Sequence, residues 1–277
     1  MKKLLLLITV SLTVLYAQAQ SCCQKPLQFK TLAMANAFKE SHESPLPYHF
    51  ESDKGSMVEF NTIDGKTGRA YYVPTDQPTN KVLIIFPEWW GLNDYIKREA
   101  VRWQELLGNV DVYAIDLYDG QVTDDREKAS KLASGLDPKR AEAIIKGALA
   151  NAGKDKLIAT LGWCMGGTWS FIAALDANMQ ASGCVMYYGF PEQNEKRVKQ
   201  IKTDVLYIWG SQDQFITKNY VDKFEEQIKA TQHKFEFYEY NAPHAFANPS
   251  NPKFDAIYST AAEGHAVKFL KEHLALE

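Results

Sequence analysis

Short apolar runs alternate along the chain with longer amphipathic segments, as is typical of strands that alternate with helices. The apolar runs predict strands at 81–86, 110–117, 156–161, 184–188, 205–209 and 234–240. Helical spacing between and after them predicts helices at 94–107, 124–134, 138–152, 168–178, 192–201, 218–230 and 254–274. Two further runs, 57–63 and 69–73, flank a glycine-containing turn and predict a hairpin. This pattern predicts an α/β fold with a mostly parallel central sheet and helices on both faces.

The first residues have the pattern of an export signal. Two lysines and an apolar stretch at 4–16 precede Ala17 and Ala19, small residues at the two positions that signal peptidase inspects. The apolar stretch is too short for a typical transmembrane helix. We therefore predict a signal peptide at 1–19 and an exported, periplasmic or secreted, mature protein without a transmembrane segment. A lipid anchor on Cys22 is the alternative, although the residues before it lack the usual leucine.

The rest of the chain divides into an extension and one domain. Residues 20–55 are polar and contain several prolines, so we expect an N-terminal extension wrapped on the surface, with room for a short helix at 30–40. Residues 56–277 form the predicted α/β domain. A hydrophobic content of 45% is sufficient for a sizeable core. The net charge of −3 and the lack of a lysine or arginine run argue against nucleic acid or an anionic membrane as partner.

One glycine-flanked turn carries candidate chemistry. Cys164 lies in a Gly-x-Cys-x-Gly sequence between a predicted strand and a predicted helix, the setting of a nucleophile elbow. Side chains at Gly162 and Gly166 would crowd so tight a turn. We expect the turn to expose the sulfur, and the start of the next helix to favour thiolate over thiol. Taken alone, the motif is equally compatible with a buried structural cysteine.

Two later residues strengthen the interpretation of Cys164 as a nucleophile. Asp213 follows the predicted strand at 205–209, and His244 follows the strand at 234–240. The order nucleophile, acid, histidine is that of α/β-hydrolases. Because the carboxyl ends of parallel strands meet at one edge of a sheet, we expect the three side chains to form a catalytic triad there.

These motifs resemble the dienelactone hydrolase family of α/β-hydrolases. The resemblance rests on Gly-Trp-Cys-Met-Gly-Gly, the downstream Asp213, Pro-His-Ala-Phe at 243–246 and Phe-Pro-Glu-Trp-Trp-Gly-Leu-Asn at 86–93, and it extends from about Met57 to the C-terminus. It implies an α/β-hydrolase fold and an esterase or lactonase activity. It also implies that Glu88 interacts with the cysteine and helps to control its ionisation.

The expected chemistry is covalent acyl transfer. Cys164 would attack an ester or lactone carbonyl and form a thioester, while His244 takes up the thiol proton and later activates water. Asp213 would hold the imidazole in the useful tautomer. The backbone N–H groups of Trp89 and Met165 are the expected oxyanion hole.

The expected substrate is a small-molecule ester or lactone. Trp90, Tyr118 and Trp163 lie in or near the motifs and are candidates for an apolar pocket. Family members that act on lactones with a free carboxylate hold it with two arginines, one shortly after an Asp-Leu-Tyr segment and one shortly after the histidine. Here 119–121 is Asp-Gly-Gln and residue 248 is asparagine. The resemblance therefore does not extend to binding of the family's namesake substrate.

No cofactor or metal is predicted. Cys184 lies in a predicted buried strand, so we expect a core residue rather than part of a disulfide framework. The remaining histidines lack metal-ligand spacing and are expected at the surface or in the core: His42, His49, His233, His265 and His273. Two other functions remain open. One is a binding protein with little turnover, whose thiol could be oxidised, and the other is a cysteine peptidase or acyltransferase on the same scaffold. The pattern does not set an oligomeric state.

Overall fold

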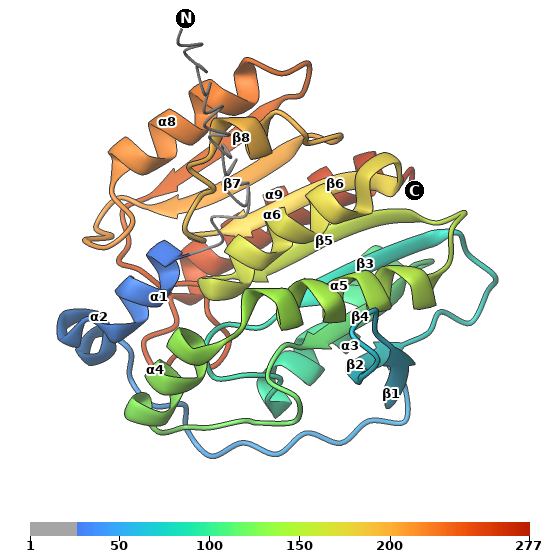
Figure 1. Ribbon diagram of the computed structural model, residues 1–277, viewed down its shortest axis with the longest axis horizontal. Helices are drawn as coiled ribbons and strands as arrows, with labels where there is room; N and C mark the ends of the chain where they lie inside the picture. The colour runs from blue at the N-terminus through green and yellow to red at the C-terminus, as the bar shows by residue number, and fades with distance from the viewer. Residues whose placement is uncertain (1–26) are drawn as a thin grey trace, which may run out of the picture.

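An eight-stranded sheet runs through the centre of the molecule in the order β1-β2-β4-β3-β5-β6-β7-β8 (Figure 1). The computed structural model describes residues 27–277, so the predicted signal peptide and Cys22 lie outside the described residues. The strands are β1 (Ser56–Asn61), β2 (Thr67–Val73), β3 (Lys81–Phe86), β4 (Asp111–Asp116), β5 (Leu157–Trp163), β6 (Ala181–Tyr187), β7 (Val205–Gly210) and β8 (Phe235–Tyr240). The β1–β2 and β2–β4 pairs are antiparallel, and all other pairs are parallel. The predicted α/β fold is confirmed.

Helices cover both faces of the sheet. The helices are α1 (Leu27–Met34), α2 (Asn36–Ser41), α3 (Asp94–Leu107), α4 (Arg126–Gly135), α5 (Pro138–Ala152), α6 (Met165–Ala177), α7 (Glu195–Val198), α8 (Lys218–Lys229) and α9 (Ala256–His273). On one face α3 and α9 pack together, and on the other α5 packs against α6 (Figure 1). Among the described residues, no helix combines the length and apolarity needed to cross a bilayer.

The central strands read as continuous apolar runs because helices cover both of their faces. β7 is buried at every position, and β3 and β5 at every position after the first. β8, at the sheet edge, is only partly buried. Since β3, β5, β7 and β8 run parallel, the loops that follow them lie at one edge, where sites assemble in open α/β sheets.

Two predicted helices differ from the observed ones. The helix expected at 192–201 is a single turn, α7, because the Asn194 side chain accepts the N–H groups of Lys196 and Arg197 and sets a late start. α6 begins three residues earlier than predicted, at Met165, directly after the elbow cysteine. The positive end of α6 therefore lies next to Cys164.

The N-terminal extension is not merely a surface wrap, and that expectation was wrong. α1 packs against α4, where Ser130 Oγ donates to the carbonyl of Ala33 at 2.7 Å. α2 and the residue after it bring Phe38 and His42 into the interior, with exposed fractions of 0% and 5%. The blue N-terminal helices lie at the periphery in Figure 1, but they contribute Phe29, Ala33 and Phe38 to the hydrophobic core.

Candidate active site

Cys164 joins β5 to α6 through a strained turn. Its φ and ψ are 53° and −118°, a left-handed φ that non-glycine residues rarely adopt. A Cβ at Gly162 would lie 2.1 Å from the carbonyl oxygen of Gly166, and one at Gly166 would lie 2.2 Å from that of Phe86. Both glycines are therefore required by close backbone approach, as predicted for a nucleophile elbow.

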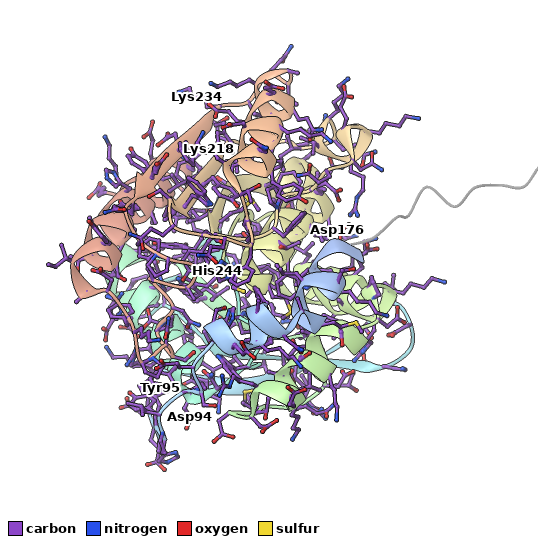
Figure 2. All side chains as sticks on the ribbon, turned by 90° about the vertical axis from the view of Figure 1, so that its left-hand side faces the viewer. Asp94, Tyr95, Asp176, Lys218, Lys234 and His244 are labelled. Carbon is purple, nitrogen blue, oxygen red and sulfur yellow. The ribbon has the colours of Figure 1, made fainter. Side chains whose placement is uncertain are left out.

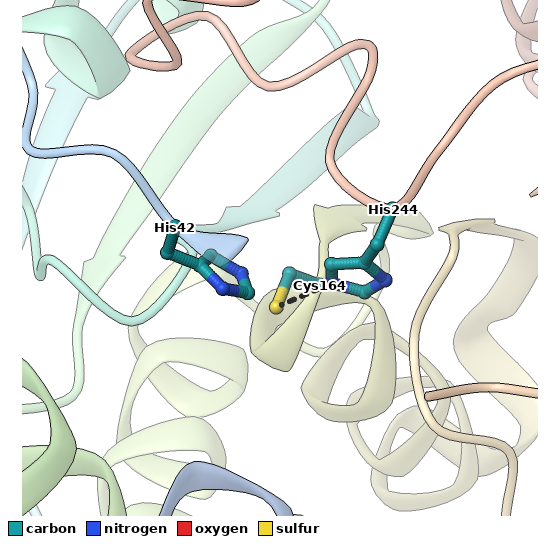
Figure 3. A group of neighbouring side chains, drawn as sticks. All are labelled: His42, Cys164 and His244. Atoms are coloured by element: carbon teal, nitrogen blue, oxygen red, sulfur yellow. Dashed lines mark hydrogen bonds between the residues drawn. The ribbon is translucent and has the colours of Figure 1, made fainter. Parts of the chain in front are cut away.

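The structure brings Cys164, His244 and Asp213 into hydrogen-bond contact. His244 Nε2 lies 3.2 Å from Cys164 Sγ, and His244 Nδ1 lies 2.6 Å from Asp213 Oδ2 (Figure 3 shows the first contact). The second carboxylate oxygen, Oδ1, accepts the N–H groups of Phe215 and Ile216 at 2.8 and 2.9 Å. The carboxylate is therefore fixed in orientation before it contacts the imidazole.

Electrostatics favour a charged imidazole beside the sulfur. Burial by itself lowers the pKa of His244, but the negative charges of Asp213 and Cys164 and their hydrogen bonds outweigh burial and raise that pKa to about 10. A positively charged imidazole in contact with a cysteine sulfur is an arrangement that can activate the sulfur as a nucleophile.

Two backbone N–H groups are free to hold an oxyanion. Met165 is the first residue of α6, and Trp89 follows β3 in the neighbouring loop. No acceptor within residues 27–277 takes the N–H of either residue, whereas the next N–H, of Trp90, donates to the Glu88 carboxylate. The expected oxyanion donors are thus unoccupied at the start of a helix and beside it.

Glu88 is completely buried, and its contacts differ from the expected one. Its Oε1 accepts from Ser250 Oγ at 2.5 Å and its Oε2 from the N–H of Trp90 at 3.2 Å, so its hydrogen bonds do not run to Cys164. Burial raises the pKa of Glu88 to about 7, although these hydrogen bonds oppose the rise. Asn248, at the position where the resemblance places an arginine, accepts from the backbone N–H of Ser250 at 3.0 Å. Neutral groups therefore surround this carboxyl.

We expect protein stability to fall as the pH rises through the range in which Glu88 ionises. Between about pH 4.5 and 7 the unfolded chain loses the proton while the folded protein retains it, so the free energy of unfolding decreases with pH. A shift of this size corresponds to about 3 kcal/mol. Urea unfolding of the wild type and of Glu88→Gln at pH 4.5 and pH 8 measures the effect.

The Glu88→Gln variant should lose this pH dependence. Its amide can donate to Ser250 Oγ while the Ser250 hydroxyl turns to Asn248 Oδ1, which lies 3.0 Å away. An exposed substitution, Glu272→Gln, is the control and should follow the wild type. Equal pH dependence in the wild type and in Glu88→Gln would contradict the assignment.

The predicted pocket residues divide into two groups. Tyr118 is buried and donates its hydroxyl to Met165 Sδ at 3.2 Å, and Trp90 packs against Trp89 with 5.0 Å between ring centroids. Trp163 instead lines a cavity of about 430 Å³ bounded by α3 and α9, whose lining does not include Cys164. Neighbouring residues on a strand point to opposite faces, so the residue before the nucleophile faces away from it.

Phe38 and His42 lie over the candidate triad, and the sequence motifs did not reveal them. The His244 ring centroid is 5.6 Å from that of Phe38 and 5.3 Å from that of His42. Figure 2 shows His244 beside the blue N-terminal helices. Cys164 is only 1% exposed, so the expected exposure of the sulfur was wrong in this conformation. The spacing from Phe38 to His42 places both on one helix face, the only signal in the sequence for this contact.

Comparison with known proteins places the chain in a family. Residues 69–274 match the family model of the dienelactone hydrolase family. The chain belongs to this family. It is 28% identical to a carboxymethylenebutenolidase of Pseudomonas putida, across 77% of this chain and 94% of that protein. It is 27% identical to protein usf of Aquifex pyrophilus, across 79% and 99%.

The fold also has solved counterparts. The structure of a dienelactone hydrolase from Anabaena variabilis matches with a TM-score of 0.59 at 16% identity, across 80% of this chain and 99% of that one. The mostly parallel sheet with helices on both faces is thus the α/β-hydrolase-like fold expected from the motifs. Of the cysteines in the described residues, Cys164 and Cys184 are both free and buried. Burial raises the pKa of Cys184 to about 11, in keeping with an inert core thiol.

Proposed function

We propose that the protein hydrolyses small carboxylic esters or lactones through a Cys164–His244–Asp213 triad and a thioester intermediate. The observation that carries the proposal is the hydrogen-bonded chain from Asp213 through His244 to the sulfur of a strained elbow cysteine. Membership of the dienelactone hydrolase family, and relatives named carboxymethylenebutenolidase, support an ester or lactone as substrate.

In the proposed reaction, the thiolate of Cys164 attacks the carbonyl carbon and the carbonyl oxygen becomes an oxyanion between the N–H groups of Met165 and Trp89. The carbon–oxygen bond to the leaving group then breaks, and the leaving alkoxide takes the proton from His244 Nε2. The resulting thioester is attacked by water, whose proton passes to His244. Release of the carboxylic acid restores the thiolate and imidazolium.

Neutral residues near the candidate triad favour substrates that have no free carboxylate for an arginine to bind. Asn248 and Ser250, both neutral, occupy the loop after His244, and the buried ring of Tyr118 lies close to the elbow through its contact with Met165. Because Phe38 and His42 pack on His244 and Cys164 is buried, we propose that α2 moves away from His244 when substrate binds. We therefore propose an uncharged ester or lactone that enters beneath a displaced α2.

We further propose that the mature protein is exported. The support is the arrangement of two lysines, an apolar stretch and small residues before Gln20. Export would place the nucleophilic thiol in an oxidising compartment. Burial of Cys164 beneath Phe38 and His42 would limit its oxidation there, since exposure governs the reactivity of thiolates.

Hydrolysis of p-nitrophenyl acetate and butyrate tests the proposed function. We expect release of p-nitrophenol together with a mass increase of one acyl group on the peptide that contains Cys164, trapped by acid quenching. Cys184 is the internal control, because its buried thiol should remain unmodified. An intact protein that neither turns over these esters nor acylates Cys164 would instead favour the binding-protein alternative.

A further inference from the structure

His42 has a buried nitrogen that lacks a protein partner. Its Nδ1 lies 2.7 Å from the carbonyl oxygen of Phe38, which can only accept, so Nδ1 carries the proton. Its Nε2 therefore presents a lone pair, and this atom is buried without a hydrogen-bond partner among the described residues. A buried acceptor in this state costs free energy, so its presence calls for an explanation.

The unpartnered histidine faces the candidate nucleophile. One ligand atom from each of His42, Cys164 and His244 lies within 4.8 Å of the others, and all three residues are buried. Figure 3 shows the His42 ring close to the Cys164 sulfur, and its centroid lies 5.3 Å from that of the neighbouring His244 ring. In a tetrahedral zinc site, bonds of about 2.3 Å to sulfur and about 2.0–2.1 Å to nitrogen place ligand atoms roughly 3.5 Å apart. The observed spacing of at most 4.8 Å would have to close by only about 1 Å to match it.

Both histidines are held as metal-binding histidines usually are. A ligating histidine typically donates its other ring N–H to a carboxylate or a backbone carbonyl, which fixes the ring and its tautomer. Here His244 Nδ1 contacts Asp213 at 2.6 Å, and His42 Nδ1 contacts the Phe38 carbonyl at 2.7 Å. The Nε2 atoms of His42 and His244 are therefore both directed so that they can bind a metal ion beside the sulfur of Cys164. One sulfur and two imidazole nitrogens suit a borderline-soft ion such as Zn²⁺.

We propose that His42, Cys164 and His244 form a three-ligand site for Zn²⁺ or a similar transition-metal ion, with a fourth position open to water. The thiolate and the His42 nitrogen bind directly, and the ion displaces one proton from His244 Nε2, so one proton is released per ion and no oxidation occurs. The bound ion joins α2 to the loops after β5 and β8. The site itself rests on this geometry. Because the ion would occupy Cys164 and His244, it should also inhibit ester hydrolysis, and only this expectation rests on the proposed function.

Metal binding is measured on the full chain with Cys22→Ser and Cys23→Ser, which removes the two N-terminal thiols as competing ligands. Co²⁺ serves as the spectroscopic probe and Zn²⁺ titration calorimetry gives the affinity. We expect one ion per chain and a thiolate-to-cobalt charge-transfer band. His42→Gln should weaken Zn²⁺ binding by about 10-fold or more. His49→Gln, in the same N-terminal segment but with a side chain 75% exposed, is the matched control and should bind as the parent does.

A missing charge-transfer band, or equal Zn²⁺ affinity with and without His42, would overturn the site. A second measurement covers the case in which His42→Gln does not fold. Zn²⁺ should slow tryptic cleavage after Lys39 of the parent protein about 10-fold or more, because cleavage requires α2 to detach; unchanged cleavage would exclude His42 as a ligand. Ester hydrolysis by the metal-free parent separates the two proposals. An active enzyme without a cobalt band refutes only the metal site, and an inactive one with the band refutes only the hydrolase.

Discussion

Replacing Cys164 by alanine is expected to lower kcat/KM for p-nitrophenyl butyrate by roughly 10⁵-fold or more, leaving a rate close to that of the oxyanion hole and solvent water alone. The sulfur contacts His244 Nε2 and is the atom that forms the covalent bond to the substrate in the proposed reaction. Steady-state kinetics with protein at micromolar concentration measures the loss, and the absence of acylated protein by mass spectrometry confirms its cause.

Cys184→Ala is the matched control for Cys164→Ala. Cys184 is equally buried, in β6, but its Sγ lies 3.6 Å from Ser170 Oγ and away from the triad. We expect this control to retain kcat/KM within about a factor of two and to lose about 1 kcal/mol of stability through the small cavity. Full activity in Cys164→Ala would disprove covalent catalysis by this residue. Alanine at position 164 keeps the same strained φ, so the elbow itself should not change.

The bounds of helices such as α3, and the meeting of the three triad residues, follow from signals that are local in the sequence. Helical spacing and Gly108 predicted α3 at its observed bounds, and in the structure Asn93 caps its start by accepting from the N–H of Ile96. The contact of Cys164, Asp213 and His244 could be expected because each follows a parallel strand. Parallel pairing aligns the carboxyl ends, so chain order and strand direction together place the three side chains at one edge.

The packing of Phe38 and His42 over the candidate site could not be predicted from such local signals. Phe38 lies in α2 and His42 directly follows it, in a segment that pairs with no strand, and their spacing does not determine which surface they meet. The contacts of Glu88 were missed for a related reason. Its partner Ser250 is 162 positions away in the sequence, in a loop without periodicity. Strand alternation, in contrast, is a local signal that places Trp163 on the face away from Cys164.

Asp213→Asn is expected to lower kcat/KM about 10⁴-fold by trapping the wrong tautomer of His244. Two backbone N–H groups, of Phe215 and Ile216, donate to Oδ1 of the native carboxylate. They would hold the carbonyl oxygen of the asparagine and direct its NH₂ group at His244 Nδ1. That nitrogen must then accept, so the proton moves to Nε2, which can no longer take the proton of the Cys164 thiol.

The same substitution removes the negative charge that raises the pKa of His244 to about 10, so that pKa should fall. Steady-state kinetics measures the loss of rate, and NMR titration of the imidazole C–H signals measures the pKa. Asp176→Asn, at a partly buried aspartate that pairs with Lys146 and lies outside the candidate triad, is the control and should change neither quantity appreciably. A folded Asp213→Asn protein with wild-type kcat/KM would exclude Asp213 from the triad, because the contact with His244 would then have no bearing on proton transfer from the sulfur.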